Sequence, residues 1–183
     1  EQSIINRNEH RAQSLLHGYS VRNVGPVTMS GRVSDIAVHP DTARIFYVGI
    51  GSAGVFKTTN GGITMEPIFD NQGGALGAGD IAISPSNPNI LWVGTGENNS
   101  SRSTYAGTGV YKSVDAGKTW EFMGLRNTQH IGRILIHPEN PDIVWVASMG
   151  ALYSRNDERG LYKTTHGGKT WEKTLFINDN TGI

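Results

Sequence analysis

A short turn motif occurs three times in this chain, and its repetition constrains the fold more than any other feature of the sequence. The first two copies begin 55 residues apart (58 to 113), and the next interval is 51 residues (113 to 164). The copies read Thr58-Thr59-Asn60-Gly61-Gly62-Ile63-Thr64-Met65, Ser113-Val114-Asp115-Ala116-Gly117-Lys118-Thr119-Trp120 and Thr164-Thr165-His166-Gly167-Gly168-Lys169-Thr170-Trp171. A nearly constant period of about 50 residues indicates a repeat architecture.

Each repeat also contains four segments with the pattern of short β-strands. An apolar strand ends in proline, a second apolar strand follows, a third reads Gly-aliphatic-aromatic-Lys before the turn motif, and a weaker fourth comes after it. The segments are 33–40, 80–85 and 133–138; 45–48, 90–93 and 143–146; 54–57, 109–112 and 160–163; and 65–69, 120–123 and 171–176. Such units are typical of propeller blades. The sequence therefore predicts an all-β fold, a partial β-propeller of about three four-stranded antiparallel blades with units at 30–70, 77–124 and 130–177.

The first 18 residues are polar and are predicted to form an N-terminal arm with a short helix over residues 9–16. The alternating segment 19–24 predicts a strand that completes the last blade, so that residues 19–183 form one partial propeller. A propeller closes with about 4–8 blades, and three blades leave sheet faces uncovered. We therefore expect the chain to be the N-terminal fragment of a longer propeller, with the remaining blades or a second copy of the chain covering those faces.

The composition excludes several classes of function. Lys and Arg total 16, as do Asp and Glu, and the resulting zero net charge does not favour nucleic acid or an anionic membrane. There are no cysteines, and no apolar run approaches the roughly 18 residues of a membrane span. HxH and HExxH spacings, a phosphate loop and a Ser-His-Asp arrangement are all missing, so neither metal nor cofactor is predicted. His39 and His137 precede prolines and are interpreted as turn residues.

Loop lengths indicate which end of the sheets carries function. The distance from the strand-ending proline to the turn motif grows from 18 residues in the first repeat (40 to 58) to 28 (85 to 113) and 26 (138 to 164). The insertions fall at 96–106 and 150–159, between the second and third strands. Alternate connections of an antiparallel meander lie at opposite ends, so the turn motifs share one end and the long loops share the other. Because functional residues concentrate on variable loops, the long-loop end is favoured.

The turn motif resembles the Asp-box, or BNR, repeat, Ser/Thr-x-Asp-x-Gly-x-Thr-Trp. The second copy matches it fully, whereas the first has Asn60 and Met65, and the third has His166, at the Asp or Trp places. Asp and Asn side chains bond nearby backbone N–H groups, and Gly supplies positive φ, so we interpret the motif as structural. Its residues are Thr58, Asn60, Gly62, Thr64, Ser113, Asp115, Gly117, Thr119, Trp120, Thr164, His166, Gly168, Thr170 and Trp171.

From residue 21 to 183 the chain resembles the N-terminal portion of bacterial sortilin-like exported proteins with BNR repeats. The motifs that carry the resemblance are Arg22-Asn23-Val24-Gly25-Pro26, Ser30-Gly31-Arg32-Val33, Gly94-Thr95-Gly96-Glu97, His130-Ile131-Gly132-Arg133-Ile134 and Asn156-Asp157-Glu158-Arg159-Gly160. The resemblance implies a secreted, cell-surface or periplasmic bacterial protein whose signal peptide has been removed. Members are often labelled glycosyl hydrolases. In the similar two-propeller xyloglucanases the catalytic Asp position corresponds to the neighbourhood of Gly51, where this sequence has no carboxylate.

Candidate ligand-binding residues lie at strand starts and in the two long loops. Arg32 and Arg133 each follow a glycine and are predicted to occupy comparable positions that line a central funnel. The alternative is that they bridge neighbouring blades through carboxylates such as Asp35 or Asp80. Glu97 is interpreted either as an acid/base or ligand contact, or as the ion-pair partner of a neighbouring arginine. The candidate set is Arg32, Glu97, Asn98, Tyr105, Arg133, Tyr153, Arg155 and Glu158; no catalytic residue is assigned.

Two functions follow from these residues. The first is a non-enzymatic, extracytoplasmic propeller module that binds a protein, peptide or glycan on its long-loop face. The alternative is the N-terminal part of a carbohydrate-active glycoside hydrolase. A usual glycosidase needs two carboxylates flanking the scissile bond, so the missing carboxylate near Gly51 favours the first. Two or more of Glu97, Asp157 and Glu158 within about 5–10 Å of each other would favour the second.

Overall fold

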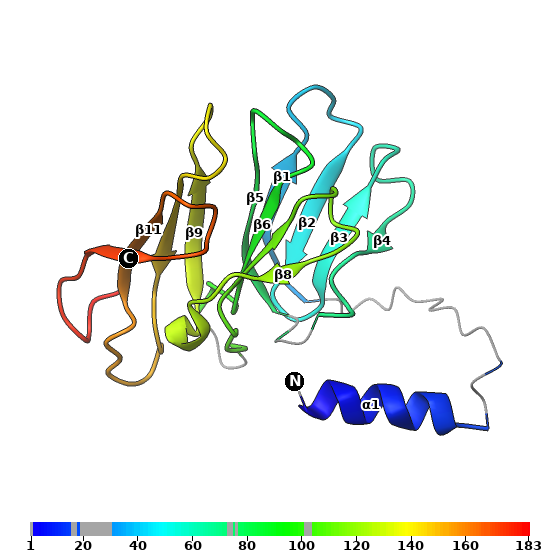
Figure 1. The fold of residues 1–183 in the computed structure, drawn as a ribbon, viewed down its shortest axis with the longest axis horizontal. Helices are drawn as coiled ribbons and strands as arrows, with labels where there is room; N and C mark the ends of the chain where they lie inside the picture. The colour runs from blue at the N-terminus through cyan, green and yellow to red at the C-terminus, as the bar shows by residue number, and fades with distance from the viewer. Residues whose placement is uncertain (1, 16–17, 19–30, 73–74, 76, 101–103) are drawn as a thin grey trace. The chain divides into compact units, whose positions relative to one another are not determined.

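The chain forms three four-stranded antiparallel sheets that follow one another along the sequence (Figure 1). The computed structural model describes residues 2–15, 18, 31–72, 75, 77–100 and 104–183. Blade 1 contains β1 (Val33–Val38), β2 (Phe46–Ile50), β3 (Gly54–Thr58) and β4 (Glu66–Pro67); blade 2 contains β5 (Ala78–Ile83), β6 (Leu91–Thr95), β7 (Val110–Ser113) and β8 (Glu121–Phe122); blade 3 contains β9 (Ile131–Ile136), β10 (Val144–Ser148), β11 (Gly160–Thr164) and β12 (Glu172–Leu175). The predicted all-β partial propeller of three four-stranded blades is confirmed.

Among the described residues, one α-helix precedes the blades. α1 spans Gln2–Gln13, and Gln2 Nε2 donates to Asn6 Oδ1 at 2.9 Å, one helical turn away. The predicted helix over 9–16 is therefore wrong at both ends. Gln, Arg and Glu favour helix even without an apolar face, so the helix starts earlier, and the chain bends at Ser14. Residues 1–30 and 31–183 are separate compact units. The predicted strand at 19–24 lies outside the described residues.

The hydrophobic core lies between blades rather than within one. Successive side chains of a strand point to opposite faces of its sheet. Leu91 and Val93 of β6 therefore pack toward blade 1, whereas Trp92 between them packs toward blade 3. The first cluster joins Ala37, Tyr47 and Val55 to Ile81, Leu91, Val93 and Tyr111; the second joins Trp92 and Val110 to Ile134, Val144, Val146 and Tyr162.

The Asp box of blade 2 folds as a hydrogen-bonded turn. Ser113 Oγ accepts the Gly117 N–H at 2.9 Å, and Asp115 Oδ1 accepts the Thr119 N–H at 2.9 Å. The Thr119 hydroxyl donates to Asp115 Oδ2 at 2.6 Å and is the main cause that holds the pKa of Asp115 at about 2. Gly117 has φ of 89°, a conformation that glycine reaches without strain.

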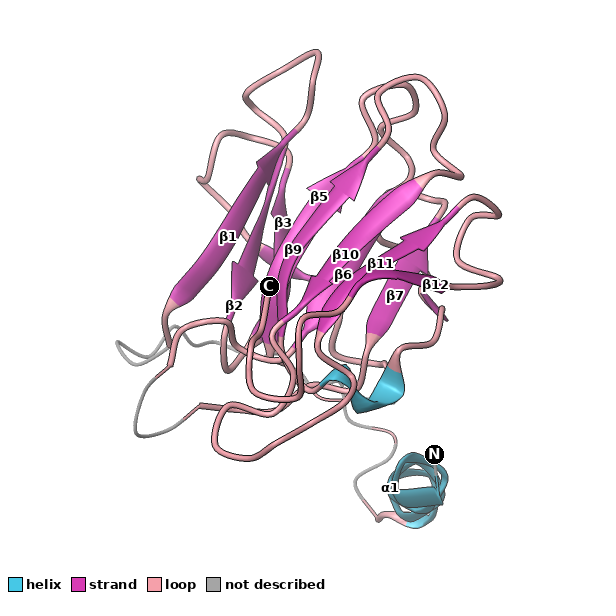
Figure 2. Ribbon diagram, turned by 90° about the vertical axis from the view of Figure 1, so that its left-hand side faces the viewer, coloured by secondary structure: helices cyan, strands magenta, loops and turns pink. Residues whose placement is uncertain are grey.

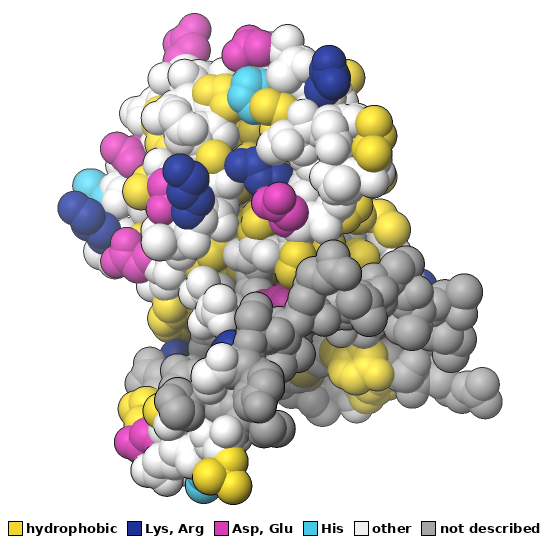
Figure 3. Space-filling model, turned by 90° about the vertical axis from the view of Figure 1, so that its right-hand side faces the viewer, with side chains coloured by type: hydrophobic (Ala, Val, Ile, Leu, Met, Phe, Trp, Pro, Cys, Tyr) yellow, Lys and Arg dark blue, Asp and Glu magenta, His cyan; other side chains and the backbone are white. Residues whose placement is uncertain are grey.

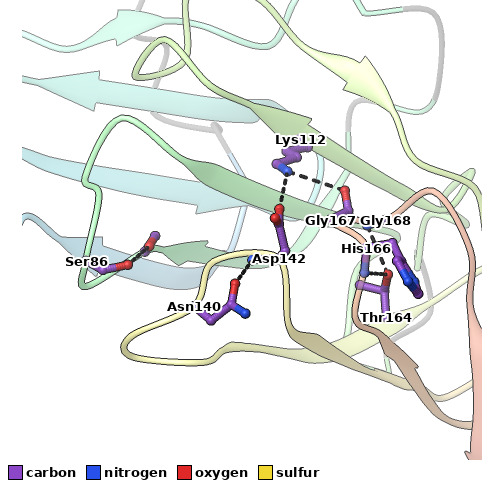
Figure 4. Close-up of polar contacts among 9 residues, drawn as sticks. Ser86, Lys112, Asn140, Asp142, Thr164, His166, Gly167 and Gly168 are labelled. Atoms are coloured by element: carbon purple, nitrogen blue, oxygen red, sulfur yellow. Dashed lines mark hydrogen bonds and ion pairs between the residues drawn. The ribbon is translucent and has the colours of Figure 1, made fainter.

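The two imperfect copies keep the turn with other side chains. In blade 1, Asn60 Oδ1 accepts the matching backbone N–H at 3.0 Å. In blade 3, Thr164 Oγ1 accepts the Gly168 N–H at 3.1 Å (Figure 4), and His166 Nδ1 lies 3.4 Å from Thr170 Oγ1. A hydroxyl and an Asx or His side chain thus suffice for the turn.

Lysines join the Asp-box turns of blades 2 and 3 to the preceding blade. Lys57 Nζ donates to the Ala116 carbonyl at 2.9 Å, and Lys112 Nζ donates to the Gly167 carbonyl at 3.3 Å. Lys112 also lies 3.8 Å from the Asp142 carboxylate, as Figure 4 shows. The same contact therefore recurs at both blade interfaces.

The Asp-box tryptophans make a contact in the opposite direction. Trp120 Nε1 donates to the Ile68 carbonyl at 2.8 Å, and Trp171 Nε1 donates to the Met123 carbonyl at 2.7 Å. Each indole thereby anchors its turn on the fourth-strand region of the blade before it. Blade 1 has Met65 at this place and cannot donate such a bond.

The two ends of the sheets differ in structure. In Figure 2 the β1 and β5 arrows point to the same end, and the 3-10 helix η1 (Arg126–Thr128) lies at the other. Because strands alternate in direction, the Asp-box turns lie at the first end, and the loops after β6 and β10 lie at the η1 end. On the side nearest β4, acidic, basic and hydrophobic side chains are interspersed (Figure 3).

Candidate functional site

Glu97 is the centre of the polar contacts at the long-loop end. It directly follows β6 and Gly96, and its side chain is 1% exposed. Glu97 Oε1 accepts a bond from Arg32 Nε, which stands immediately before β1 of blade 1. Arg32 is 46% exposed, and this bond raises its pKa. The predicted alternative, an ion pair of Glu97 with a neighbouring arginine, is thus present.

The carboxyl group of Glu97 lies in the space that a side chain at Gly51 would occupy. A Cβ added to Gly51 would lie 2.8 Å from Glu97 Cδ and 2.9 Å from Cγ. No carboxylate stands near Gly51 in the sequence, but in the folded chain the carboxylate of Glu97 lies beside it. Blade 2 supplies a carboxylate to this place across the blade interface, which a search along the sequence of blade 1 does not detect.

Two side-chain oxygens on adjacent residues are buried without a hydrogen-bond partner. They are Glu97 Oε2 and Asn98 Oδ1, and the statement covers the described residues. The Glu97 carbonyl faces His130 Nδ1 at 2.9 Å. Because a carbonyl only accepts, Nδ1 carries the proton, and burial lowers the pKa of His130. The neutral ring therefore supports the Glu97 backbone.

Tyr105 borders the same group. Its carbonyl accepts the Glu97 N–H at 3.0 Å, which closes the base of the first long loop. The Tyr105 side chain is 53% exposed. We call Arg32, Glu97, Asn98, Tyr105 and His130 the Glu97 cluster. It combines a buried carboxylate, an exposed cation and an exposed aromatic ring, and four of its five members belong to the predicted set.

Arg133 lies elsewhere, among the innermost strands. Its Nη1 atom is 3.3 Å from Asp80 Oδ1 and 3.7 Å from Asp35 Oδ1. In strand register Arg133 opposes Ala147, whereas Asp35 opposes Gly49 and Asp80 opposes Gly94. Arg133 is therefore the counterpart of the two aspartates.

Arg32 has a different counterpart. It stands one residue before Val33, whose partner on β2 matches the partner of Ile131 on β10, so Arg32 corresponds to His130. The prediction that Arg32 and Arg133 occupy comparable positions is wrong. Both follow a glycine, but Arg32 stands before the first paired residue of β1, whereas Arg133 lies two residues after the first paired residue of β9. The predicted alternative, bridging of blades through Asp35 and Asp80, describes the contacts of Arg133.

Two aspartates form a repeated contact between innermost strands. Asp35 Oδ2 accepts the Ile81 N–H at 3.2 Å, and Asp80 Oδ2 accepts the Ile134 N–H at 2.7 Å. Burial, and secondly the charge of Asp35, raises the pKa of Asp80 to about 6. Both aspartates were predicted only as partners of an arginine; their shared position five residues before a proline is the signal that identifies them.

The second long loop, 150–159, is organised by Arg159, which the candidate set does not include. Arg159 is 6% exposed, and it donates to the carbonyls of Met149 and Ala151, to Ser154 at 3.1 Å and to Asp179 at 2.9 Å. Four carbonyl acceptors on one guanidinium hold the loop in one shape. The only sequence signal is an arginine placed before the glycine that opens β11.

The remaining candidates belong to this loop. Arg155 pairs with Asp179 at 3.4 Å, and Tyr153 is 79% exposed. Glu158 accepts the Tyr162 hydroxyl at 3.0 Å and raises the pKa of that tyrosine, second to burial. Glu97 and Glu158 thus use partners on different blades.

A cleft of about 430 Å³ lies beside the loop, lined by Gly132, Arg133, Ala147, Met149, Leu152, Arg159, Gly182 and Ile183.

The described residues contain no group of three or more His, Cys, Asp or Glu side chains that could hold a metal ion. Nor does this part of the chain include a helix that is long and apolar enough to cross a membrane.

No protein-family model and no curated protein matches the sequence. Several solved structures are similar in fold. An ancestral GH74 enzyme has a TM-score of 0.61 and 19% identity over 83% of this chain and 19% of its own. The GH74 xyloglucanase from Xanthomonas campestris has a TM-score of 0.56 and 18% identity over 79% of this chain and 21% of its own. YCF48 bound to D1 peptide has a TM-score of 0.55 and 14% identity over 85% of this chain and 44% of its own.

These likenesses bear on the fold and on the extent of the domain. The chain spans about a fifth of the length of the GH74 chains and less than half of the YCF48 chain. Sequence identities of this size show a shared fold and do not show a shared activity. Three blades in succession, matched within larger chains, mark this protein as a partial β-propeller domain.

Proposed function

We propose that the chain is an extracytoplasmic β-propeller binding module of the sortilin-like, BNR-repeat type, and that its long-loop face holds a protein, peptide or glycan ligand. The observation that carries the proposal is the Glu97 cluster. A carboxylate that is 1% exposed keeps one oxygen without a partner beside an arginine and a tyrosine that are about half exposed.

A buried oxygen without a partner lowers the stability of the folded protein, so this group is not explained by a stabilising role. A buried acceptor without a partner destabilises the folded state by about 1–3 kcal/mol. Within the described residues, Glu97 Oε2 and Asn98 Oδ1 are two such acceptors on adjacent residues. A ligand that brings N–H or O–H donors to this place removes that cost. Arg32 and Tyr105 then present a half-exposed guanidinium and a ring face to the same ligand.

The second candidate function is a contribution to a carbohydrate-active glycoside hydrolase. The specific observation in its favour is that Glu97 fills the space at Gly51, the position compared above with the catalytic Asp of xyloglucanases. The likeness to GH74 enzymes, including a xyloglucanase, supports this candidate. A usual glycosidase requires a second carboxylate across the scissile bond, and Glu158 is bonded to Tyr162 of its own blade. A peptide ligand is supported by the similar YCF48 structure, which contains a D1 peptide.

A glycan array, a peptide array and a glycosidase screen on the protein separate these outcomes. Binding that falls at least tenfold in Glu97→Gln and Tyr105→Ala supports the binding module. Val114→Ser is the matched control, because Val114 is 64% exposed on the Asp-box turn at the opposite end. Binding that is unchanged in both cluster variants contradicts the proposal. Hydrolysis that is abolished by Glu97→Gln selects the hydrolase instead.

We further propose that the three blades are the N-terminal part of a larger propeller in a secreted, cell-surface or periplasmic protein. Large apolar side chains on the two outermost sheets support this, among them Ile36 at 53% and Leu135 at 57% exposure. Remaining blades or a second copy would bury them.

A further inference from the structure

The outer sheet face of blade 3 repeats the pattern of residues that pack at the internal interfaces. We call the face that a blade turns to the next blade its trailing face, and the opposite one its leading face. Each trailing face has four corresponding positions in the strand register: an apolar residue on the first strand, an aromatic residue on the second, and an aliphatic residue and a lysine on the third. They are Ala37, Tyr47, Val55 and Lys57 in blade 1; Ala82, Trp92, Val110 and Lys112 in blade 2; and Leu135, Trp145, Leu161 and Lys163 in blade 3.

The trailing face of blade 3 is arranged like the two that are covered. Lys163 lies over the Trp145 ring at 5.4 Å, as Lys112 lies over Trp92 at 5.4 Å. Lys112 continues to a carbonyl of the following Asp-box turn. Leu135, at the apolar place beside Trp145, is 57% exposed. This face therefore matches a further blade with an Asp-box turn.

A second copy of the chain would bring its blade 1 to this face, and only part of the contact would match. The Gly61 carbonyl is the counterpart of the Ala116 and Gly167 carbonyls and could accept Lys163. Met65, however, replaces the tryptophan whose N–H bonds the preceding blade at both internal interfaces. A contact between two copies would therefore lack the tryptophan hydrogen bond that is present at both internal interfaces.

The innermost strands add a second mismatch. Asp35 and Asp80 accept a backbone N–H of the following blade. At blade 3 this place holds Arg133, which has no acceptor. The counterpart N–H of a second copy, that of Ile36, would be buried beside a guanidinium. A blade that presents a carbonyl or carboxylate there would instead pair with Arg133.

The start of a following innermost strand is already occupied by the chain itself. The Ile183 N–H donates to the Ser148 carbonyl at 3.3 Å. A Cβ on Gly182 would lie 2.9 Å from Met149 Cα. Gly77, just before β5, lies against Gly51 in the same manner. Arg32 and Val33 of a second copy would need the place that Gly182 and Ile183 fill.

We infer that the trailing face of blade 3 receives a fourth blade whose innermost strand begins at Gly182–Ile183, and that Met65 and Arg133 exclude a second copy of the chain from this face. The inference rests on the proposed larger propeller and selects between the two covers named there. It does not depend on the ligand of the Glu97 cluster, so failure of the binding experiments leaves it standing.

Sedimentation velocity of the chain between about 1 and 100 µM tests the exclusion. We expect that the wild type does not dimerise through the trailing face of blade 3, so that Leu135→Glu does not change its sedimentation. We expect a variant that combines Met65→Trp and Arg133→Asp, and ends at Asn180, to associate at least tenfold more tightly than the wild type ending at Asn180. Lys163→Met in that variant is the control and should reverse the gain.

Two results would overturn the inference. One is a wild-type dimer that disappears in Leu135→Glu, because a second copy then covers the trailing face. The other is a combined variant that associates no more tightly than the shortened wild type, because Met65 and Arg133 then do not separate the faces. Circular dichroism on each variant confirms that the blades remain folded.

Discussion

Asp80 carries a charge at a boundary between blades where water hardly reaches it. Its side chain is 2% exposed, and burial is the first cause that raises its pKa to about 6. An unfolded Asp has a pKa near 4, so the folded protein binds this proton more tightly than the unfolded chain does. The stability that the group contributes is therefore fully present below pH about 4 and is lost as pH rises through about 6.

We predict that Asp80→Asn flattens this pH dependence. The amide oxygen still accepts the Ile134 N–H, and no charge remains to be desolvated. The shift corresponds to at most about 3 kcal/mol at pH 8, so the variant should be as stable as the wild type at pH 3.5 and more stable at pH 8. Urea unfolding at both pH values measures this. Asp142→Asn is the control, since Asp142 is 61% exposed. A variant with the wild-type slope would contradict the assignment.

Asp115 makes the opposite contribution. Bonds from Thr119 lower its pKa to about 2, so its stabilising effect is present above pH about 4 and is lost as pH falls through about 2. We predict that Asp115→Ala lowers the free energy of unfolding by about 1–2 kcal/mol, because the Thr119 N–H loses its acceptor. Asp115→Asn should cost less, since Asn60 already fills this role in blade 1. Equal losses in the two variants, measured by urea unfolding at pH 7, would show that the acceptor is irrelevant.

Elements are joined across blades by single polar atoms placed on large side chains. Trp120 packs edge-on against Phe69 at 5.2 Å while its Nε1 bonds the Ile68 carbonyl. We predict that Trp120→Phe keeps most of the ring packing, removes this bond and lowers the free energy of unfolding by about 1–2 kcal/mol. Trp171→Phe should behave alike at the next interface. Met65→Leu is the control, because Met65 makes no such bond. Thermal unfolding of the three variants measures the losses. A loss in Met65→Leu as large as in Trp120→Phe would refute the role of the indole N–H.

Strand order and Asp-box turns could be predicted because both are local. Alternation, prolines and glycines set each strand within its own repeat, as with Ile81 and Pro85. Contacts between blades were not accessible in this way. Glu97 reaches Gly51 across 46 residues (51 to 97), and nothing in either segment specifies the other. Arg32 and Arg133 looked alike in sequence because each follows a glycine, although Arg32 corresponds to His130 and Arg133 to Asp35.

At the scale of the whole molecule, stability depends on how many faces of a blade are covered. Blade 2 contributes to both core clusters, whereas blades 1 and 3 each contribute to one. This follows the logic of repeat proteins, in which each unit is stabilised by its neighbours. The polar contacts obey the same rule, because Lys112 and Trp120 connect blade 2 in both directions.

We therefore predict that amide hydrogen exchange is slowest in β6. The strands β2, β6 and β10 are each hydrogen-bonded on both sides within their sheets, so they differ mainly in the covering of their faces. All five residues of β6 are buried, whereas β2 and β10 each include partly exposed residues. Local opening should therefore require more free energy in β6, and its amides should exchange at least about tenfold more slowly. Mass spectrometry of deuterated peptides over 46–50, 91–95 and 144–148 measures this. Equal protection of the three strands would mean that the outer faces of blades 1 and 3 are covered in solution, and would move the search for their cover to residues 1–30 or to self-association.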